Sequence, residues 1–352
     1  MSFSEKEITC NACFVHGEGD IHFEPHQVKL AEGEILVKVT CGGICGSDVH
    51  YYQHGRAGMS VLHHPMIIGH EFVGKVCEVN SDDERFCVGQ PVVVNPSRPC
   101  NECPECLTGH QNLCQSMRFM GSAQFNPHVN GGFSEYVAVK PEQCLPYSEQ
   151  VSPKVMAFSE PLSVAIHAVN VAGQLTGKKV LVIGAGPIGC LILAAAKCAG
   201  ASIVVASDLS QRCRELASQM GASTVFDPTD DSQVSYYQNN RGYFDVVFEA
   251  SGASAAIAST VDFTHPNGVI VQIGMGASPM TWPVSSMLAK EISFKGSFRF
   301  VHEFATSVQW LEQGRVDPTP LISAEFSPDQ VQEALITAGN KEISSKVLIN
   351  FE

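Results

Sequence analysis

The chain has 352 residues, with 22 Lys and Arg against 36 Asp and Glu, and a formal net charge of −14 at pH 7. A chain of this length can bury a sizeable core, and two domains are the natural expectation. The acidic balance argues against nucleic acid or an anionic membrane surface as the main partner. A local basic site can still bind a small anion.

The 14 cysteines indicate a compartment as well as a chemistry. A short secreted chain with many cysteines would be a disulfide scaffold, but this chain is long, and Met1 to Glu7 lack the apolar region of a signal peptide. We therefore expect a cytoplasmic protein with reduced thiols, some of them bound to metal. The longest charge-free apolar stretch, residues 180–196, contains Gly and Pro early on, so we expect no membrane span.

The predicted elements change character along the chain. Short β-branched runs at residues 34–40, 72–79, 91–95 and 133–139, separated by Gly, Pro and Asp, predict an antiparallel or barrel-like β region. A segment with helical spacing, residues 153–173, follows as a connector.

From Val180 onward, apolar strands alternate with helices, which predicts βαβ units around a parallel sheet. The pattern fades past about Phe294, and the tail from Ser327 predicts a capped helix and a closing strand. We therefore expect an α/β protein. Its doubly wound parallel-sheet domain, residues 156–296, is inserted into a β-rich domain formed by residues 1–155 and 297–352.

A glycine-rich turn carries the first chemical signal. Gly184, Gly186 and Gly189 follow the strand VLVI and open a helix of small residues. They permit a tight turn, close approach of a pyrophosphate, and packing of the helix on the strand. Asp208 ends the next strand and can accept hydrogen bonds from ribose hydroxyls, which favours NAD; Arg212, one helical turn on, can partly admit NADP. The alternative is a plain turn with an exposed aspartate.

Four cysteines in one short polar loop carry the second signal: Cys100, Cys103, Cys106 and Cys114. Four thiolates at this spacing can surround a tetrahedral Zn²⁺ and leave no open position, so this zinc should be structural. The alternatives are four reduced thiols or a nucleic-acid-binding zinc module. Few Lys or Arg lie nearby, which argues against the second.

A third group comprises Cys45, His70, Glu71 and Glu160, each next to Gly or Pro turns. Thiolate, imidazole and carboxylate together suit a catalytic zinc that keeps one position open. From spacing alone, a buried cysteine and a hydrogen-bonded core histidine explain these residues better.

The segments GGICGSDVHYY, GHEFVGKV, the four-cysteine loop, EPLSVAIHA and VLVIGAGPIG change that weighting. In this order, over nearly the whole chain, they resemble the zinc-dependent medium-chain dehydrogenases, specifically the polyol (sorbitol) dehydrogenase branch. Residues 117–136, PSRPC, KVMAFSEPL and FKGSFRF resemble the L-idonate 5-dehydrogenases more than the sorbitol dehydrogenases. The resemblance implies a GroES-like catalytic domain, a Rossmann NAD(P)-binding domain, one catalytic and one structural Zn²⁺, and a homodimer or homotetramer.

The resemblance also implies roles for residues of the third group. Cys45, His70 and Glu71 would bind the catalytic zinc, and Glu160 would hold a zinc-bound water or replace Glu71 on the metal. In alcohol dehydrogenases a second cysteine stands where this chain has Glu160, and an oxygen-rich site suits polyhydroxylated substrates.

Proton release has two candidate routes. Ser47 and His50 stand at positions that resemble the family's relay, and Glu160 acting through water is the competing base. His50 taken alone could also be a surface histidine.

Further family positions concern the coenzyme and the substrate. Besides the glycines, Asp208 and Arg212, the implied coenzyme contacts are Pro187, Ile188, Ile273, Gly274, Met275, Phe298, Arg299 and Phe300. The sorbitol branch usually has Tyr at the last of these positions, so Phe300 weakens an assignment to sorbitol.

The substrate is expected to be a small sugar acid or polyol. Arg299 and Arg118 are the candidates for binding a carboxylate, with Tyr51 and His128 as hydroxyl partners. Arg118 and His128 could equally be surface or packing residues. We therefore expect an L-idonate dehydrogenase, with a sorbitol- or xylitol-type polyol 2-dehydrogenase as the alternative. A relative of the same fold that binds without turnover is the option from another class.

Overall fold

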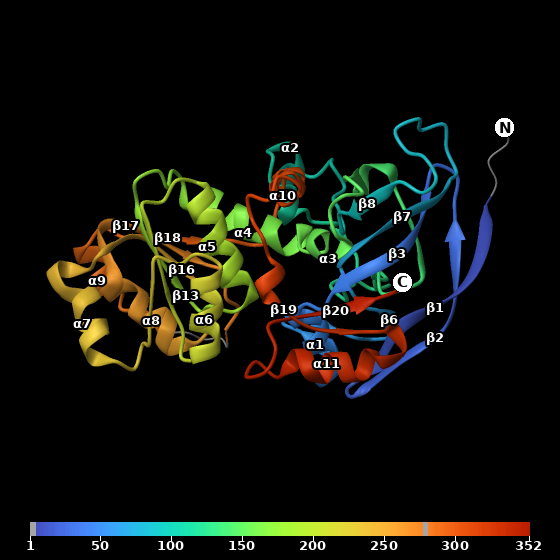
Figure 1. The fold of residues 1–352 in the computed structure, drawn as a ribbon. Coiled ribbons are helices and arrows are strands. Elements are labelled where there is room, and N and C mark those ends of the chain that lie inside the picture. The colour runs from blue at the N-terminus through green and yellow to red at the C-terminus, as the bar shows by residue number, and fades with distance from the viewer. Residues whose placement is uncertain (1–4, 277–280) are drawn as a thin grey trace. The chain divides into compact units, whose positions relative to one another are not determined.

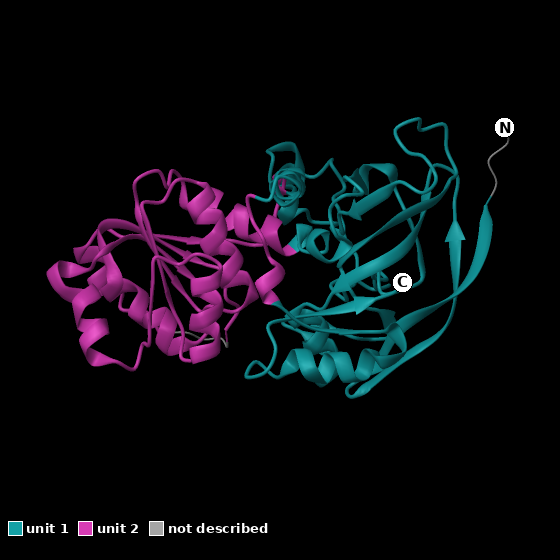
Figure 2. Cartoon of the chain, viewed as in Figure 1, with its two compact units in different colours: residues 1–160, 304–314, 322–352 teal, residues 161–303, 315–321 magenta. Residues whose placement is uncertain are grey.

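The computed structural model describes residues 5–276 and 281–352, which form two compact units (Figure 2). Unit 1 comprises Met1–Glu160, Phe304–Gly314 and Ile322–Glu352. Unit 2 comprises Pro161–Glu303 and Arg315–Leu321. The expectation of a cytoplasmic protein drew partly on residues 1–4, which lie outside the described residues.

Unit 1 is rich in β-structure, as the short β-branched runs predict. Its main strands are β1 (Lys6–Gly17), β2 (Asp20–Leu30), β3 (Ile35–Gly43), β6 (Met66–Ile67), β7 (Glu71–Val79), β8 (Pro91–Val94), β11 (Tyr136–Val139), β12 (Cys144–Pro146), β19 (Ile322–Phe326) and β20 (Lys346–Asn350). Short two-residue strands are β4 (Arg56–Ala57), β5 (Ser60–Val61), β9 (Ser97–Arg98) and β10 (Arg118–Phe119).

The strands of unit 1 form a large mixed sheet and a separate hairpin sheet. The large sheet runs in the order β12-β8-β7-β3-β20-β19, and β11 also pairs with β3. Its pairs are antiparallel except for β19 with β20, which is parallel. The hairpin β1-β2 pairs with β6. Buried Ile35, Val37 and Val39 of β3 anchor one core cluster together with Phe72 of β7.

Short helices connect these strands: α1 (Gly46–His54), α2 (Pro104–Leu107), α3 (Pro153–Met156), α10 (Glu303–Glu312) and α11 (Val331–Gly339). Helix α1 begins after Cys45 because the Asp48 carboxylate accepts the backbone N–H of Cys45 at 2.9 Å. It ends at Gly55, whose left-handed φ of 60° lets its N–H donate to the carbonyl of Tyr51. Leu335 of α11 packs in a second core cluster together with Val49 and Tyr52 of α1.

Unit 2 alternates strands and helices, as predicted from Val180 onward. Its strands are β13 (Lys179–Ile183), β14 (Ile203–Ser207), β15 (Thr224–Phe226), β16 (Phe244–Glu249), β17 (Thr264–Gln272) and β18 (Ser293–Gly296). Its helices are α4 (Ser159–Ala172), which starts in unit 1, α5 (Pro187–Cys198), α6 (Gln211–Gln219), α7 (Asp231–Gln238), α8 (Ser254–Phe263) and α9 (Val284–Ala289).

The strands of unit 2 form one parallel sheet in the order β15-β14-β13-β16-β17-β18. Figure 1 labels β13, β16, β17 and β18 of this sheet. The order runs outward from β13 in both directions, and parallel crossovers are right-handed, so the helices cover both faces. The sheet is therefore doubly wound, and its switch point lies at the carboxyl end of β13. Apolar residues of its strands are buried with Phe226 and Phe263 in one cluster.

Within the described residues, no helix combines the length and apolar character needed to cross a membrane.

Candidate active site and zinc centres

Three of the predicted zinc ligands converge in unit 1. Cys45 precedes α1, whereas His70 directly precedes β7 and Glu71 is its first residue. One ligand atom from each of these residues lies within 4.8 Å of the other two. His70 and Glu71 are buried and Cys45 is half-buried. The fold thus brings together a thiol, an imidazole and a carboxylate from two segments of the chain.

Asp48 ties these two segments together. Its Oδ2 accepts the backbone N–H of Cys45 at 2.9 Å, and its Oδ1 accepts the backbone N–H of Gly69 at 3.1 Å. The side chain is fully buried, and Oδ1 lies 3.9 Å from Nδ1 of His70. Asp48 therefore fixes the backbone on both sides of the ligand cluster.

Glu71 is held by a buried lysine. Nζ of Lys346, on β20, lies 2.6 Å and 2.9 Å from the two carboxylate oxygens of Glu71 and also donates to the carbonyl of Ile44 at 3.1 Å. Gly43 makes room for this carboxylate, because a Cβ there would collide with Oε2 of Glu71. The carboxylate is thus oriented by the protein itself.

The donor set fits a metal cation. Burial opposes protonation of His70, but the nearby Cys45 sulfur, with Asp48 and Glu160, raises its pKa well above the ordinary value. Burial likewise opposes the charge on Lys346, yet Glu71, Cys45 and Glu160 raise its pKa. Nδ1 of His70 is buried, with no hydrogen-bond partner among the described residues. The negative potential favours a bound cation, and a thiol, an imidazole and a carboxylate are ligand types that Zn²⁺ accepts.

The remaining predicted catalytic residues lie around this cluster. Glu160, in the first turn of α4, is buried and acts electrostatically on His70, but it is not part of the close group of ligand atoms. Ser47 is half-buried in the first turn of α1. His50 is exposed on the same helix, its ring 5.7 Å from that of His54. Burial, together with His54 and Lys341, lowers the pKa of His50.

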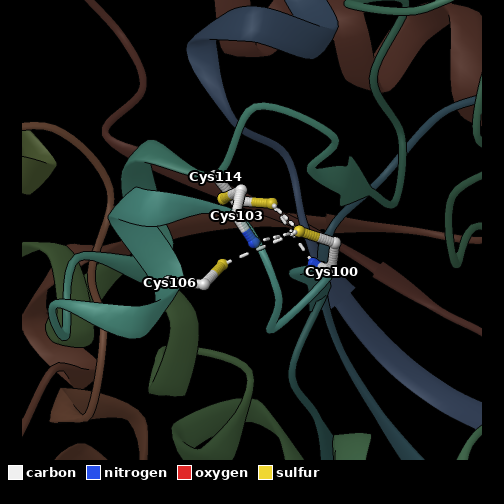
Figure 3. A group of neighbouring side chains, drawn as sticks. All are labelled: Cys100, Cys103, Cys106 and Cys114. Carbon is white, nitrogen blue, oxygen red and sulfur yellow. Dashed lines mark hydrogen bonds between the residues drawn. The ribbon is translucent and has the colours of Figure 1, made fainter.

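The four cysteines of the second signal also converge, within a loop of unit 1 (Figure 3). Their sulfur atoms all lie within 4.8 Å of one another. Sγ of Cys100 is 3.5 Å from Sγ of Cys114 and 4.0 Å from Sγ of Cys106. A tetrahedral zinc with Zn–S bonds of about 2.3 Å requires sulfur separations of about 3.8 Å. The observed spacing fits such an ion.

Backbone N–H groups prepare this loop for a charged sulfur. Backbone hydrogen bonds lower the pKa of Cys100 to about 7, and the N–H of Cys103 donates to its sulfur at 3.4 Å. Burial raises the pKa of Cys106 to about 12 in the metal-free loop. A bound cation would have to hold Cys106 as a thiolate, which is the normal state of a zinc ligand.

The glycine-rich turn of unit 2 fits a dinucleotide. Gly184 adopts φ 89°, and Gly189 packs directly against its carbonyl, so neither position has room for a Cβ. At Gly186, which precedes α5, a Cβ would meet no described atom within 4 Å. The first and third glycines thus serve packing, whereas the second borders open space at a helix N-terminus, the kind of place that suits a pyrophosphate. Pro187 and Ile188 form the first turn of that helix.

Asp208 stands beside this turn at the end of β14. Its Oδ2 accepts the N–H of Ala185 at 2.8 Å and its Oδ1 that of Ser210 at 2.8 Å. The carboxylate therefore connects the glycine-rich turn to the next loop and retains further acceptor capacity for ribose hydroxyls. Nη1 of Arg212 is buried with no hydrogen-bond partner in the described part of the chain.

The other implied coenzyme residues lie at or beyond the ends of β17 and β18. Ile273, Gly274 and Met275 follow β17, and the side chain of Met275 is exposed. Phe298, Arg299 and Phe300 follow β18; Phe300 is buried, and the Arg299 guanidinium lies 4.9 Å from the Phe298 ring centroid. Arg299 adopts φ 54°, a left-handed conformation that is uncommon for a residue with a side chain.

Three predicted substrate contacts in unit 1 already bond within the chain. The Tyr51 hydroxyl accepts the N–H of Ala123 at 3.0 Å. His128 donates from Nδ1 to the carbonyl of Phe125, and its Nε2 accepts the N–H of His63. Nη2 of Arg118 donates to the carbonyl of Pro127 at 3.0 Å. These contacts order the loop around residues 118–128, and a direct role in substrate binding stays a prediction.

Sequence reasoning missed the two residues that organise the predicted zinc ligands. Asp48 carries a local signal, because an acidic residue three positions after a helix N-cap is typical of a capping box. Lys346 carries a weaker one, a lysine at the start of an apolar closing strand, and its partner Glu71 is 275 residues away.

Family models match both parts of the chain. A model described as the alcohol dehydrogenase GroES-like domain matches residues 31–149, and one described as a zinc-binding dehydrogenase matches residues 187–313. These matches confirm the expected fold class, a GroES-like β-rich domain together with a Rossmann-type parallel sheet.

Individual relatives cover nearly the whole chain. L-idonate 5-dehydrogenase (NAD(P)(+)) of Escherichia coli K12 is 43% identical over 345 residues, which is 98% of this chain and 100% of the relative. The crystal structure of L-idonate 5-dehydrogenase from E. coli K-12 superimposes with a TM-score of 0.96, covering 99% of this chain and 100% of that chain. A probable D-xylulose reductase A of Neosartorya fischeri is 35% identical, covering 88% and 90% of the two chains.

Proposed function

The chain belongs to the zinc-dependent medium-chain dehydrogenases, and from this membership we propose that it oxidises L-idonate to 5-keto-D-gluconate with NAD(P)⁺, reversibly. The observation that carries the proposal is the convergence of Cys45, His70 and Glu71 within a chain that resembles an L-idonate 5-dehydrogenase over nearly its full length. The sequence identity to D-xylulose reductases is lower, which favours a sugar acid over a neutral polyol.

The two cofactors supply the reactive chemistry. A Zn²⁺ held by Cys45, His70 and Glu71 would supply Lewis acidity that lowers the pKa of a substrate hydroxyl, and a bound NAD(P)⁺ would supply the hydride acceptor. We assign the second Zn²⁺, held by Cys100, Cys103, Cys106 and Cys114, a structural role, because four protein ligands leave no open position.

The chain's own residues prepare the site. Lys346 neutralises and orients the Glu71 carboxylate, and Asp48 fixes the backbone at Cys45 and Gly69. Such prior fixing saves reorganisation when the substrate binds. Glu160 is buried close enough to act on His70 electrostatically, and we propose that it orients a water or exchanges with Glu71 as a ligand.

A proton must leave the substrate hydroxyl during oxidation. We propose that Ser47 receives it and that His50, exposed on the next turn of α1, releases it to solvent. Burial lowers the pKa of His50, so the ring is neutral at pH 7 and can accept a proton. Glu160 acting through water is the competing route.

We propose Arg118 and Arg299 as the candidates for binding the substrate carboxylate, and Tyr51 and His128 as hydroxyl partners. A guanidinium matches a carboxylate in shape and charge, and this local positive charge operates despite a net charge of −14. The Arg118 fork uses Nη2 on Pro127, which leaves its other N–H groups as donors.

We assign catalysis to residues 1–155 with 297–352 and coenzyme binding to residues 156–296. We propose a homodimer or homotetramer in which two copies meet through β18, the strand that ends the parallel sheet and whose four residues are all exposed. Exposed Val284 and Leu288 on α9 precede this edge in sequence, and an edge strand can pair with the edge strand of a second copy.

We propose a cytoplasmic location because the described cysteines are all free thiols.

A substrate panel tests the proposal. The protein with zinc is offered L-idonate, other hexonates, sorbitol and xylitol, each with NAD⁺ and NADP⁺, and coenzyme reduction is followed by absorbance. We expect L-idonate to give the highest kcat/KM. A strong preference for sorbitol or xylitol would assign the chain to the polyol dehydrogenases instead.

The variant Arg118→Ala tests the proposed carboxylate contact. It should raise the KM for L-idonate and leave the KM for xylitol unchanged; an unchanged KM for both substrates removes Arg118 as the carboxylate anchor.

A further inference from the structure

A fully buried carboxylate lies at the carboxyl edge of the parallel sheet in unit 2. Glu249 is the last residue of β16, and its exposed fraction is 0%. Ligands of doubly wound folds bind at this edge, near the switch point at β13. The roles assigned above give Glu249 no part in either zinc site or in the glycine-rich turn.

The Glu249 carboxylate is surrounded by hydrogen-bond donors from two loops. Oε1 accepts the backbone N–H and the hydroxyl of Ser251, and the N–H of Gly252 bridges Oε1 and Oε2 at 3.2 and 3.0 Å. Nε2 of Gln272, the last residue of β17, donates to Oε2 at 2.6 Å. An ionised carboxylate only accepts hydrogen bonds, so this ring of donors stabilises the charge without a basic residue.

The same charge fixes the amide of Gln272. Its Nε2 also donates to the carbonyl of Gly274 at 2.7 Å, whereas its Oε1 is buried with no partner among the described residues. Turning the amide over would place Oε1 against the carboxylate and the Gly274 carbonyl. Glu249 therefore sets the orientation of Gln272, and Gln272 in turn holds the loop after β17.

The two loops pack against each other and against the glycine-rich turn. A Cβ on Gly274 would collide with the N–H of Gly252, and a Cβ on Gly252 would lie 2.7 Å from the carbonyl oxygen of Met275. A Cβ on Gly184 would lie 2.7 Å from the N–H of Ser251. At these close approaches, a shift of the loop at residues 250–253 must move both neighbouring segments.

We propose that Glu249 is a positioning residue for the coenzyme, an inference that rests on the NAD(P) binding proposed above. Its buried charge fixes the positions of residues 250–253 and 272–275. In these positions the glycine-rich turn and the end of β17 can both contact one extended dinucleotide. Glu249 itself touches no coenzyme atom, because its side chain is fully enclosed by these loops.

The position of β16 and β17 in the sheet makes the inference specific to one half of the coenzyme. Asp208, which suits the adenosine ribose, directly follows β14 on one side of β13. Glu249 and Gln272 end strands on the other side. A dinucleotide crosses the switch point between these two sides, so Glu249 governs the nicotinamide half.

The test compares Glu249→Gln with the unaltered protein for binding of NADH and of AMP, which carries only the adenosine half. In the variant an amide N–H₂ faces N–H donors, so we expect the Kd of NADH to rise about tenfold or more. The Kd of AMP should stay within about twofold, as expected for an independent site. Both constants are measured by titration without substrate, so the outcome is independent of which alcohol the enzyme oxidises.

Two further variants separate positioning from general damage. Glu249→Asp keeps the charge and should recover part of the NADH affinity. Thr260→Val removes a buried hydroxyl bond in α8, the helix that follows the same loop, and should lower the Tm without changing the Kd of NADH. If NADH affinity falls equally in Thr260→Val at a matched loss of Tm, or if AMP and NADH weaken together in Glu249→Gln, Glu249 has no positioning role. Unchanged NADH binding in Glu249→Gln overturns the proposal as well.

Discussion

Nζ of Lys346 lies 2.6 Å from Oε2 and 2.9 Å from Oε1 of Glu71, although 275 residues separate the two along the chain. Both side chains are almost fully buried, at 5% and 2% exposed. The last strand of unit 1 therefore reaches Glu71, a proposed ligand of the catalytic zinc, through one charge pair. Removing the positive charge of Lys346 leaves the Glu71 carboxylate buried and unpaired.

Replacing Lys346 by Met should destabilise the metal-free protein by about 3 kcal/mol, because an unpaired buried charge is left behind. The loss should be smaller in the zinc-loaded protein, where the ion beside Glu71 replaces part of the missing positive charge. Urea unfolding of both forms measures the difference. Lys346→Arg keeps the charge and serves as the matched control; an equal loss with and without zinc would show that Glu71 does not approach the metal.

The two zinc sites should be separable by single cysteine changes. Cys45→Ser is expected to abolish turnover and remove only the catalytic zinc, since a hydroxyl is a poor substitute for a thiolate ligand. Cys103→Ser should remove only the other zinc and lower the Tm. Metal analysis measures the zinc content of each variant, and oxidation of L-idonate measures its turnover. Cys87→Ser, which changes an exposed cysteine, is the control. Activity retained in Cys45→Ser would rule out zinc catalysis.

Coenzyme preference should depend on two neighbouring side chains. Asp208→Ala is expected to raise the Kd of NADH about tenfold, because charged hydrogen bonds to ribose are lost, and to reduce discrimination against NADPH. Arg212→Ala should weaken NADPH and leave NADH unchanged, because its buried Nη1, which has no partner in the described chain, would face a 2′-phosphate. Fluorescence titration of both coenzymes tests this. Equal effects on NADH and NADPH in Arg212→Ala would contradict it.

Glu303 should make stability depend on acid pH. Burial raises its pKa, but hydrogen bonds from His167, Asn170 and the N–H of Val301 outweigh this effect and lower the pKa from 4.5 to about 2. The folded state thus favours the ionised carboxylate. This contribution is present above pH 4.5 and is lost as the pH falls toward 2.

Glu303→Gln should therefore lower the free energy of unfolding by up to about 3 kcal/mol at pH 7. The deficit relative to the unaltered protein should stay constant down to about pH 5 and shrink below pH 4.5. Denaturant unfolding of both metal-free proteins at matched pH measures it. A deficit that does not change with pH would mean that the charge of Glu303 contributes nothing.

Sequence patterns predicted the elements whose signal is local. The apolar runs of β13, β14 and β16 are recovered because strands buried on both faces are continuously apolar. The run at residues 34–40 continues to Gly43 as β3, because Gly42 and Gly43 pair with β7 and β20 and give space to Phe133 and Glu71. The two glycines thus mark places where the side chains of Phe133 and Glu71 lie close to the strand backbone, which the sequence patterns did not predict.

Other features have no local signal. The hairpin β1-β2 was not predicted, because its buried positions include Cys10, Ala12 and Cys13, which are weakly apolar and do not alternate regularly. The Lys346–Glu71 pair and the ring of donors around Glu249 depend on side chains that only the folded chain brings together. Resemblance brought Cys45, His70 and Glu71 into one hypothesis, and the structure brings them within 4.8 Å.

The bridge from Asp48 to the backbone of Cys45 and Gly69 bears on how the two metals exchange with solution. These hydrogen bonds hold the two segments that carry the proposed catalytic ligands together without a metal, so we expect a chelator to withdraw that ion, and another divalent metal to replace it, while the domain stays folded. In the four-cysteine loop the thiols themselves accept the bonds that shape the chain, such as that from the N–H of Cys100 to Sγ of Cys114. We therefore expect loss of its ion to disturb this loop more than loss of the other ion disturbs the Cys45 site, and the two ions to exchange at different rates.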